Sequence, residues 1–311
     1  MTHYRVAAAA AVAVALGLLL PGPGARAAGT FAVATYNLEN YLDQPAGSRP
    51  AKSAPARAAI RGSIRALAPD VLAMQEMGGT NALLELRASL KSDGLNYAYW
   101  EHISAFDTNI HVAILSRFPF AARRPHTNEG FLLHGRRFPV SRGFAEVDVQ
   151  VNPQYRFTLI VAHLKSRRGV PEADESELRE QEAIVLREII DARLKADPGV
   201  NLLVLGDFND LKDSRPVKIV LGRGRNALTD TRPAELDDGA ESLENRPPTR
   251  TVAWTYYFAK EDTYSRIDYI LLSPGMAREW QSHGTFALRR PDWGVASDHR
   301  PIIARFQSAD Q

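Results

Sequence analysis

The chain has 311 residues, 45% of them apolar and 24% charged, which excludes a disordered chain and fits a folded globular protein. It contains no cysteine, which excludes disulfides and thiolate metal sites. Arg5 and Arg26 lie in the first 27 residues, where no acidic residue occurs; without them the 38 Lys and Arg fall to 36, equal to the 36 Asp and Glu. Any basic surface for nucleic acid must therefore be local.

The N-terminal segment has the three-part pattern of a secretory signal peptide. Arg5 precedes the apolar run Val6–Leu20, and Ala25–Ala27 forms a small-x-small cleavage site after helix-breaking residues. The apolar run is shorter than the ~20 residues that span a bilayer, which disfavours an uncleaved membrane anchor. We expect residues 1–27 to be a signal peptide and residues 28–311 to form a single domain. The mature protein would be secreted or periplasmic, without stable membrane insertion.

Apolar segments typical of strands alternate with amphipathic segments typical of helices through the rest of the chain. Several predicted strands are consecutive, which favours mixed rather than purely parallel sheets. In chain order we predict a strand over Phe31–Tyr36, a helix over Ala56–Ala68, a strand over Asp70–Gln75, a helix over Asn81–Lys91, strands over His111–Leu115, Phe144–Val151 and Phe157–Ala162, a helix over Glu175–Lys195, and strands over Asn201–Leu205, Ile267–Leu272 and Ile302–Phe306.

Two segments between these elements are expected to be loops. Residues 231–250, rich in Asp, Glu, Pro and Arg, are typical of a long surface loop. Residues 121–142 hold a local basic excess, which is either a solvated loop or a surface that follows a phosphate backbone. The arginines concerned are Arg123, Arg124, Arg136, Arg137 and Arg142.

Polar residues able to carry chemistry recur where predicted strands end. Each alone is a weak signal, because such residues often only cap turns or form structural hydrogen bonds. Asp268 is stronger, since a carboxylate flanked by Ile267 and Tyr269 is expected to be buried and to need a partner. The recurrence at six places is the main observation: Asn37, Glu39 and Asn40; Gln75 and Glu76; His163, Lys165, Arg167 and Arg168; Asp207 and Asn209; Asp268; Asp298 and His299.

Together these residue types fit metal-assisted hydrolysis of a phosphoester. Oxygen ligands such as Glu76 and Asn37 suit Mg²⁺ or Mn²⁺, whereas the lack of cysteine and the few histidines disfavour zinc. Two histidines with a partner carboxylate could activate water or protonate a leaving group. An amide, a lysine and arginines could hold a phosphate oxyanion.

The same motifs, in this order, resemble the endonuclease/exonuclease/phosphatase (DNase I-like) superfamily in its secreted bacterial type. They extend over roughly residues 30–307 and are specific when they occur jointly. The resemblance implies an α/β fold, a four-layer sandwich in which two mixed β-sheets pack face to face with helices outside. It rests on the segments TYNLEN, QE, VAILSRFPF, AHLKS, GDFND, SRIDYILL and SDHRP.

The resemblance also implies a metal site that holds Mg²⁺ or Mn²⁺. Glu76 would be the main ligand, with Asn37 beside it. Asp298 would lie at or near the metal. Glu39 stands where relatives often have an acidic residue near a metal, so it is included in the expected ligand set.

Catalytic roles are implied in the same way. His299 would be the general base or a phosphate contact, with its tautomer fixed by Asp268. Asp207 would position or deprotonate the attacking water, and Asn209 would donate a hydrogen bond to a phosphate oxygen. His163 would lie across the scissile phosphate, as a contact or as an acid.

We therefore expect a secreted, monomeric, divalent-metal-dependent phosphoester hydrolase, a nuclease or phosphodiesterase that cleaves DNA or RNA by attack of water on phosphorus. Lys165 and Arg167 would extend its substrate-binding surface. One alternative is a phosphatase or phosphodiesterase for a small or lipid phosphoester, such as an inositol phosphate or sphingomyelin. Another is an inactive binding module, which the intact histidines and carboxylates disfavour.

Overall fold

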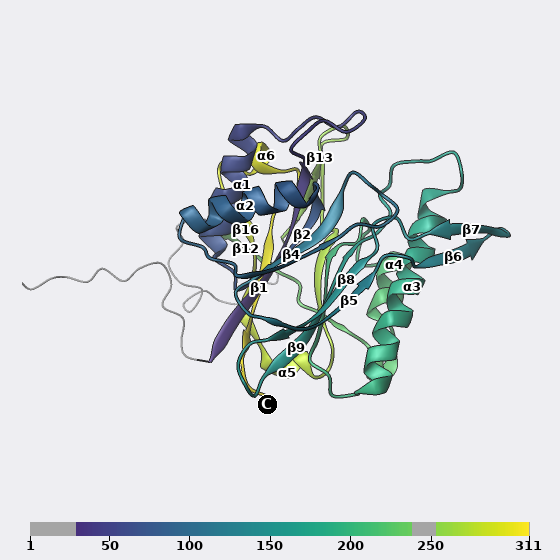
Figure 1. Cartoon of the computed structure of the whole chain (residues 1–311). Helices are drawn as coiled ribbons and strands as arrows, with labels where there is room; N and C mark the ends of the chain where they lie inside the picture. The colour runs from purple at the N-terminus through teal and green to yellow at the C-terminus, as the bar shows by residue number, and fades with distance from the viewer. Residues whose placement is uncertain (1–28, 238–252, 311) are drawn as a thin grey trace, which may run out of the picture.

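A computed structural model describes residues 29–237 and 253–310, so the expected signal peptide and most of the expected loop at 231–250 lie outside the described residues. Two large β-sheets form the centre of the molecule, and helices cover their outer faces (Figure 1). The expected four-layer α/β sandwich with two mixed sheets is confirmed.

The first sheet has seven strands and is mixed. Its strand β1 pairs in parallel with β2 and antiparallel with β17, so segments from both ends of the described chain meet at its centre. In spatial order the strands are β12 (Ala234–Asp237), β16 (Trp280–Arg289), β17 (Ile302–Gln307), β1 (Thr30–Tyr41), β2 (Val71–Met77), β4 (His111–Ser116) and β3 (Tyr99–Ile103).

The second sheet has six strands and is also mixed. β9 and β10 are parallel, because a long helix crosses over between them, whereas β10 and β15 are antiparallel. In spatial order the strands are β11 (Thr229–Asp230), β15 (Asp268–Leu272), β10 (Leu202–Asp207), β9 (Arg156–His163), β8 (Phe144–Gln150) and β5 (Phe120–His126).

The main hydrophobic core lies between the two sheets. Successive side chains of β1 point alternately into this core and toward the helices. Phe31 and Val33 point toward the second sheet, whereas Ala32 and Ala34 point toward the helices. Phe31 stacks on Phe157 of β9, with 5.1 Å between the ring centroids. Each sheet therefore buries both of its faces, which matches the nearly continuous apolar runs of the central strands.

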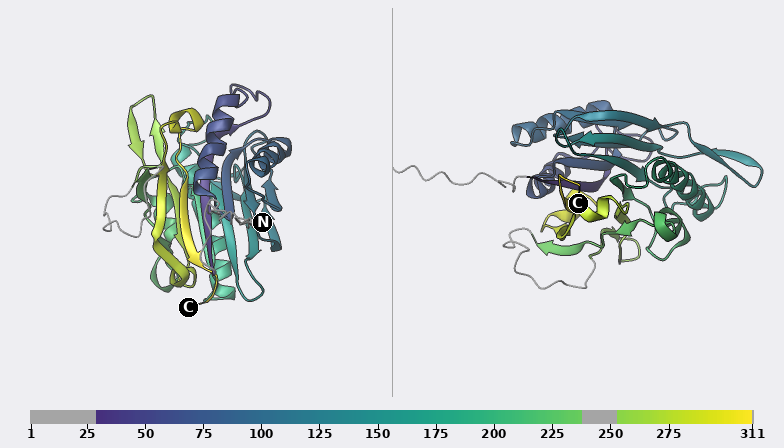
Figure 2. Two further views of the ribbon diagram at one scale, coloured as in Figure 1. Left: turned by 90° about the vertical axis from the view of Figure 1, so that its left-hand side faces the viewer. Right: turned by 90° about the horizontal axis from the view of Figure 1, so that it is seen from below.

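Helices α1 (Ala54–Leu67) and α2 (Thr80–Ser92) pack on the first sheet, and α3 (Glu175–Ala196) and α4 (Arg215–Leu221) pack on the second. The view from below in Figure 2 shows the two pairs on opposite sides. None of the helices in the described part of the chain is long and apolar enough to cross a bilayer. The remaining helical turns are η1 (Gly224–Asn226), α5 (Met276–Glu279) and α6 (Trp293–Ala296).

Two hairpins stand apart from the large sheets: β6 (Gly130–Leu133) with β7 (Arg136–Pro139), and β13 (Tyr256–Phe258) with β14 (Thr263–Ser265). The expectation of a loop over residues 121–142 is wrong, because β5 and the β6–β7 hairpin occupy this segment. The side chains of β5 alternate between exposed and half-buried, a strand pattern that its arginines conceal in the sequence. The expected loop at 231–250 likewise begins with β12.

Candidate active site

The site lies at the edge of the sandwich where three adjacent strands of the second sheet meet in register. Asp207 is the last residue of β10, and strand pairing places it beside His163 of β9 and Asp268 of β15. All three side chains are buried. Gly206 makes this approach possible: a Cβ there would lie 1.9 Å from the carbonyl oxygen of Ala162, and its φ of 132° suits glycine.

The first sheet reaches the same edge through a bent β1. The strand does not end at Tyr36 as predicted but continues to Tyr41, with left-handed φ values of 47° at Glu39 and 56° at Asn40. This bend turns the backbone N–H of Asn40 toward the Glu76 carboxylate, which accepts it at 2.9 Å. Glu76 is itself left-handed, with a φ of 57°. Backbone strain is thus concentrated at the site, as is common where function fixes geometry.

Asp207 is the centre of the site's contacts. Its Oδ2 accepts a 3.0 Å hydrogen bond from Asn37 Nδ2 and lies 3.6 Å from His163 Nε2 and 3.7 Å from His299 Nε2. Its Oδ1 accepts the backbone N–H of Asn209 at 2.8 Å. Burial raises the pKa of Asp207 to about 7 against the opposing charge of His299. This carboxyl group can therefore exchange a proton near neutral pH.

His299 forms a second buried pair at the site. Its Nδ1 lies 2.8 Å from Asp268 Oδ2. Burial alone would lower the pKa of His299, but the negative charges of Asp268 and Asp207 hold it well above its ordinary value. The raised pKa favours the protonated imidazole, whose Nδ1 donates to Asp268 and whose Nε2, 3.7 Å from Asp207, keeps its N–H for another acceptor. Asp268 is in turn fixed by its backbone N–H, which donates to Thr255 Oγ1 at 3.2 Å.

The other histidine has the opposite character. Burial, together with the positive charges of Arg142 and His299, holds the pKa of His163 well below its ordinary value. His163 is therefore a neutral imidazole next to Asp207, while His299 is cationic. The site thus combines a neutral and a charged imidazole around one carboxyl group, an arrangement that can accept and donate protons in one reaction.

Three more carboxylates face this space. Glu76 Oε1 lies 4.0 Å from His163 Nε2, and Asp298 Oδ1 lies 3.9 Å from His299 Nε2. Burial raises the pKa of Asp298 to about 6; the charge of His299 opposes this rise, and those of Glu39 and Glu76 add to it. The carboxylates are therefore close enough to repel one another.

The donor set fits a hard divalent cation. Asp298, Glu76 and Glu39 provide oxygens whose mutual repulsion a cation would relieve. Lys52, 3.0 Å from Glu39, offsets part of this repulsion and also lowers the pKa of Asp298. The side-chain oxygen of Asn40 is buried and, among the described residues, has no hydrogen-bond partner. All these donors are oxygens, as Mg²⁺ and Mn²⁺ prefer.

Asp207, Asp268 and His299 also have potential ligand atoms within 4.8 Å of one another. The hydrogen bond from His299 to Asp268 occupies one nitrogen, however, and the bond from Asn37 occupies Oδ2 of Asp207. This group is better suited to hold protons than a metal. The carboxylates near Asp298 remain the better metal site.

The predicted phosphate contacts are divided between two places: Asn209 and Arg167 lie together at the rim of the site, and Lys165 lies in a separate cavity. Asn209 Nδ2 donates to the carbonyl oxygen of Leu164 at 2.9 Å, which holds the amide at the rim of the site. The half-exposed Arg167 donates to the carbonyl oxygen of Asn209 at 3.1 Å. Asp210, for which the sequence implied no role, forms an ion pair with Arg179 at 2.9 Å and so fixes this loop.

Lys165, predicted to extend the substrate-binding surface, lies apart from the catalytic carboxyl group. Its ammonium group donates to the carbonyl oxygens of Ser166 and Arg168, at 3.1 and 2.7 Å, and lines a separate cavity beneath the β6–β7 hairpin. The alternation of β9 places His163 and Lys165 on the same face of an extended chain, but the turn after His163 redirects the lysine.

The arginine-rich segment is not a single basic surface either. Arg136 and Arg137 are exposed on β7. The other three arginines are held by carboxylates within the fold: Arg123 by Glu101, Arg124 by Glu146, and Arg142 by Asp107.

Two site residues were not identified from the sequence. Ser297 Oγ donates to the carbonyl oxygen of Asn37 at 2.8 Å and accepts the backbone N–H of His299 at 3.0 Å, so it joins the two halves of the site. The ring of Tyr256 lies against His299, with 4.7 Å between centroids. Ser297 stands inside the SDHRP motif, and Tyr256 stands in the aromatic run 254–258; these were the available signals.

An aromatic cavity of about 500 Å³ adjoins the carboxylates. The rings of Tyr257 and Trp293 meet at 89°, with centroids 5.8 Å apart. The polar residues that line the cavity are Glu39, Asp298 and Lys260, and the aromatic ones are Tyr256, Tyr257, Phe258 and Trp293.

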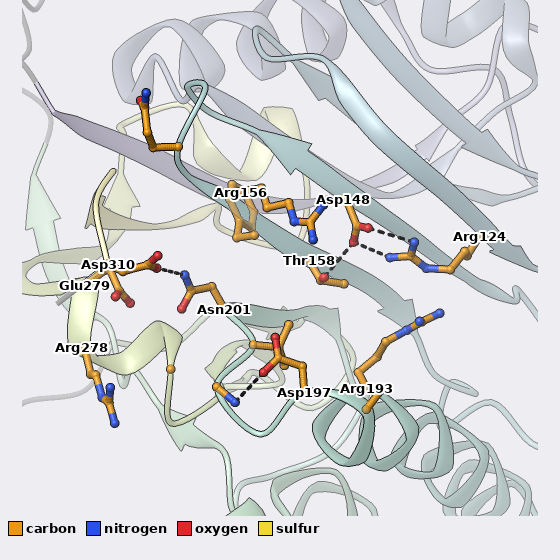
Figure 3. Close-up of a pocket in the computed structure, with 16 residues that line it drawn as sticks. Arg124, Asp148, Arg156, Thr158, Arg193, Asp197, Asn201, Arg278, Glu279 and Asp310 are labelled. Carbon is orange, nitrogen blue, oxygen red and sulfur yellow. Dashed lines mark hydrogen bonds and ion pairs between the residues drawn. The ribbon is translucent and has the colours of Figure 1, made fainter.

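Another cavity, of about 530 Å³, lies at the opposite end of the sandwich, where β9 and β10 begin (Figure 3). Two of its polar contacts lie within the lining: Arg124 pairs with Asp148, and Asn201 donates to Asp310 at 2.7 Å. None of the predicted site residues lines it. The catalytic centre therefore lies elsewhere, at the Asp207 edge.

A two-sheet sandwich with histidines, an amide and oxygen donors collected at one edge is the architecture of a metal-dependent phosphoester hydrolase. Sequence comparison specifies the family, because residues 34–299 match the model of the Endonuclease/Exonuclease/phosphatase family, and the chain belongs to it. No curated protein matches the chain.

Several solved structures are similar to this chain. The human Nocturnin catalytic domain with a bound sulfate anion has a TM-score of 0.62 at 16% identity, covering 90% of this chain and 95% of that one. Truncated TDP2 of Caenorhabditis elegans has 0.60 at 16%, covering 89% and 97%. Sphingomyelinase C from Streptomyces griseocarneus has 0.60 at 18%, covering 89% and 99%. At these identities the likeness shows the fold.

Proposed function

We propose that the protein is a secreted or periplasmic nuclease that uses Mg²⁺ or Mn²⁺ to cleave DNA or RNA by attack of water on phosphorus. The observation that carries the reaction is the set of contacts around Asp207, which brings Asn37, His163 and His299 to a single carboxyl group. A carboxyl group that titrates near neutrality, next to a cationic imidazole, suits activation of water beside a phosphoryl group.

In this reaction Asp207 accepts a proton from the attacking water while Asn37 fixes its Oδ2. His299 donates a hydrogen bond from Nε2 to a phosphoryl oxygen. The Asp268 carboxylate, paired with Nδ1 of the same ring, stabilises the charged imidazole. The neutral His163 contacts the phosphate from the other side, and Asn209 stands at the rim. Of the two roles that the resemblance implied for His299, its positive charge favours the phosphate contact over the general base.

Glu76 and Asp298, with Asn37 and Glu39 nearby, would hold the cation. When bound, a divalent cation neutralises charge on the phosphoryl oxygens and polarises the phosphorus. The residues' own contribution is to keep three carboxylates close together in spite of their repulsion. Lys52 limits that repulsion at Glu39.

Support for a nucleic-acid substrate comes from the aromatic cavity. The ring of Tyr256 lies against His299 and also lines this cavity, so a nucleotide next to the scissile phosphate would place its base near these rings. Stacking of a base on such a ring contributes about 1–3 kcal/mol and tolerates any sequence. The cavity therefore suits a substrate in which a flat base adjoins the phosphodiester.

The same cavity supports a second candidate, a phosphodiesterase for a choline lipid. Perpendicular rings such as Tyr257 and Trp293, in a cavity that is also lined by the carboxylates of Glu39 and Asp298, can hold a quaternary ammonium group by cation–π attraction. Sphingomyelinase C from Streptomyces griseocarneus, an enzyme named for sphingomyelin, shares the fold.

A substrate panel separates the candidates. The purified protein is incubated with DNA, RNA, sphingomyelin and an inositol phosphate, each with Mg²⁺, Mn²⁺ and Ca²⁺ and each with a chelator. Cleavage of DNA or RNA that needs the metal is the expected result. Release of phosphocholine or inorganic phosphate without cleavage of nucleic acid would assign the second candidate or a phosphatase and contradict the first.

Secretion rests on the sequence of residues 1–27 alone. Mass spectrometry of the protein exported by its host cells should find the chain beginning at residue 28 or 29. A chain that retains Met1 in the cytoplasm would contradict this part of the proposal. The proposed monomeric state is checked by sedimentation equilibrium.

A further inference from the structure

A second aromatic cavity lies beneath the β6–β7 hairpin, which projects beyond the second sheet in Figure 1. Its volume is about 440 Å³. Phe131 and Phe138 stack across the hairpin, at 6.1 Å between centroids and 17° between planes. Phe106, which is 70% exposed, lines the cavity from the segment before β4, and Leu178 of α3 lines it as well.

Cationic side chains that can contact a phosphate line the cavity. Arg136 and Arg137 are exposed, and among the described residues neither is paired with a carboxylate; Arg136 lies over the ring of Phe138 at 5.1 Å. Lys165 adds a buried ammonium group. Of the two carboxylates in the lining, Glu182 is already engaged by backbone N–H groups and a hydroxyl, which leaves the exposed Glu172 as the opposing charge.

The strand order connects this cavity to the catalytic centre. In the second sheet β15, β10, β9 and β8 are consecutive, and the first three carry Asp268, Asp207 and His163 at the catalytic edge. The Tyr256 cavity lies beside the start of β15, because Thr255 accepts the N–H of Asp268. The phenylalanine cavity is lined by Lys165, two residues beyond the end of β9 at His163, and by Ser141, three residues before β8. The catalytic strands thus stand between two aromatic cavities.

We propose that the phenylalanine cavity binds the base of a nucleotide flanking the scissile phosphate, so that a single polynucleotide strand is held on both sides of the cut. This inference rests on the proposed nuclease function and deepens it. An unpaired base offers a flat face to Phe131, Phe138 and Phe106, and the backbone phosphate offers negative charge to Arg136 and Arg137. A strand bound on both sides is cut internally, which makes the enzyme an endonuclease on single strands.

The charge of the cavity argues against the competing occupants. Exposed guanidinium groups repel the quaternary ammonium of a choline lipid. A bilayer would require apolar side chains that point outward from the hairpin, but Leu132, 70% exposed, is its only exposed large hydrophobic residue, while its phenylalanines line the cavity. A single-stranded nucleic acid satisfies both the rings and the arginines.

The test compares a short single-stranded oligonucleotide with bis(p-nitrophenyl) phosphate, a small diester that reaches only the catalytic centre. Phe138→Ala should raise KM for the oligonucleotide by about 5- to 100-fold, the loss of one stacked base, and leave kcat/KM for the small diester unchanged. Phe138→Trp keeps a ring and should restore oligonucleotide binding. Leu132→Ala, on the same hairpin but outside the cavity lining, is the matched control and should behave as wild type.

Circular single-stranded DNA provides the second readout, since it has no ends. Wild-type protein should linearise it. Equal losses on both substrates for Phe138→Ala, an unchanged oligonucleotide KM, or attack on linear strands alone would overturn the inference. Reduced binding of Phe138→Ala to phosphatidylglycerol vesicles with an unchanged oligonucleotide KM would instead assign the hairpin to a membrane.

Different results would refute the proposed nuclease function and the inference about the phenylalanine cavity. If wild type hydrolyses the small diester but no DNA or RNA, the proposed nuclease function fails, and this inference fails with it. If wild type cleaves nucleic acid and Phe138→Ala cleaves it equally well, only this inference fails.

Discussion

Replacement of Asp268 by asparagine tests the pair that keeps His299 charged. The substitution keeps the shape of the side chain and removes its charge, 2.8 Å from Nδ1 of His299. Two unit charges at that distance attract by about 6 kcal/mol at an effective dielectric constant of about 20, before desolvation is subtracted. Loss of this attraction lowers the pKa of His299, because the Asp268 charge is the largest of the contributions that raise it. The substitution therefore shifts the imidazole toward its neutral form.

A neutral His299 donates a weaker hydrogen bond to the phosphoryl oxygen, and we expect kcat on a small diester to fall by about 10²- to 10⁴-fold. The decrease should be smallest at low pH, where the remaining proton affinity of the imidazole restores its charge. The assay is the pH profile of kcat for wild type and Asp268→Asn, with thermal unfolding measured on both.

Asp148→Asn is the matched control, since it removes a carboxylate paired with Arg124 in the cavity at the opposite end of the sandwich. It should leave kcat unchanged even if it lowers Tm. Wild-type kcat in Asp268→Asn, or equal losses of kcat in both variants, would show that Asp268 does not keep His299 charged for catalysis.

Three further predictions concern the strand edge, the metal site and a distant histidine. Gly206→Ala should lower the free energy of unfolding in urea by more than about 2 kcal/mol, because its Cβ would meet the Ala162 carbonyl oxygen at 1.9 Å; an unchanged midpoint would show that the strands can separate there. Added Mg²⁺ should raise the Tm of wild type after treatment with a chelator and raise that of Glu76→Gln much less, since binding to the folded state adds stability; equal shifts would remove Glu76 from the ligand set. A hydrogen bond to Glu146 raises the pKa of His126 in the folded state, so the stability it contributes is fully present below about pH 6.5 and is lost as pH rises through the folded pKa. The difference in Tm between wild type and His126→Gln should therefore shrink from about pH 6 to about pH 8, and a constant difference would contradict the assignment.

The sequence predicted the elements with strong periodicity and the residues at their ends. The predicted helix Glu175–Lys195 is found as Glu175–Ala196, and Asp207 and His163 do lie side by side at the ends of neighbouring strands. These succeed because the apolar period and the strand ends are local properties of the chain. The apolar neighbours of Asp268 predicted that its carboxylate is buried and needs a partner, whereas His299 as that partner was implied by the family resemblance.

What the sequence did not predict depends on contacts between distant segments. The bend of β1 at Glu39 and Asn40 arises from pairing that resumes with β2 at Tyr41, which no local pattern reveals. The turn that directs Lys165 away from the catalytic centre is fixed by carbonyl oxygens of its own loop. The number of arginines in residues 121–142 did not reveal which of them are paired, because the acidic partners of Arg123, Arg124 and Arg142 come from other strands and loops.

The central claim is that the Asp207 edge hydrolyses the phosphodiester bonds of nucleic acid with the help of a divalent cation. The most direct measurement is cleavage of DNA and RNA by purified wild type and by His299→Ala, with Mg²⁺ and with a chelator, after both proteins are shown to be folded. Wild type should cleave with Mg²⁺, and cleavage should be lost in the chelator and in the variant. Cleavage that persists in His299→Ala or without metal, or no cleavage of any nucleic acid by wild type, would contradict it.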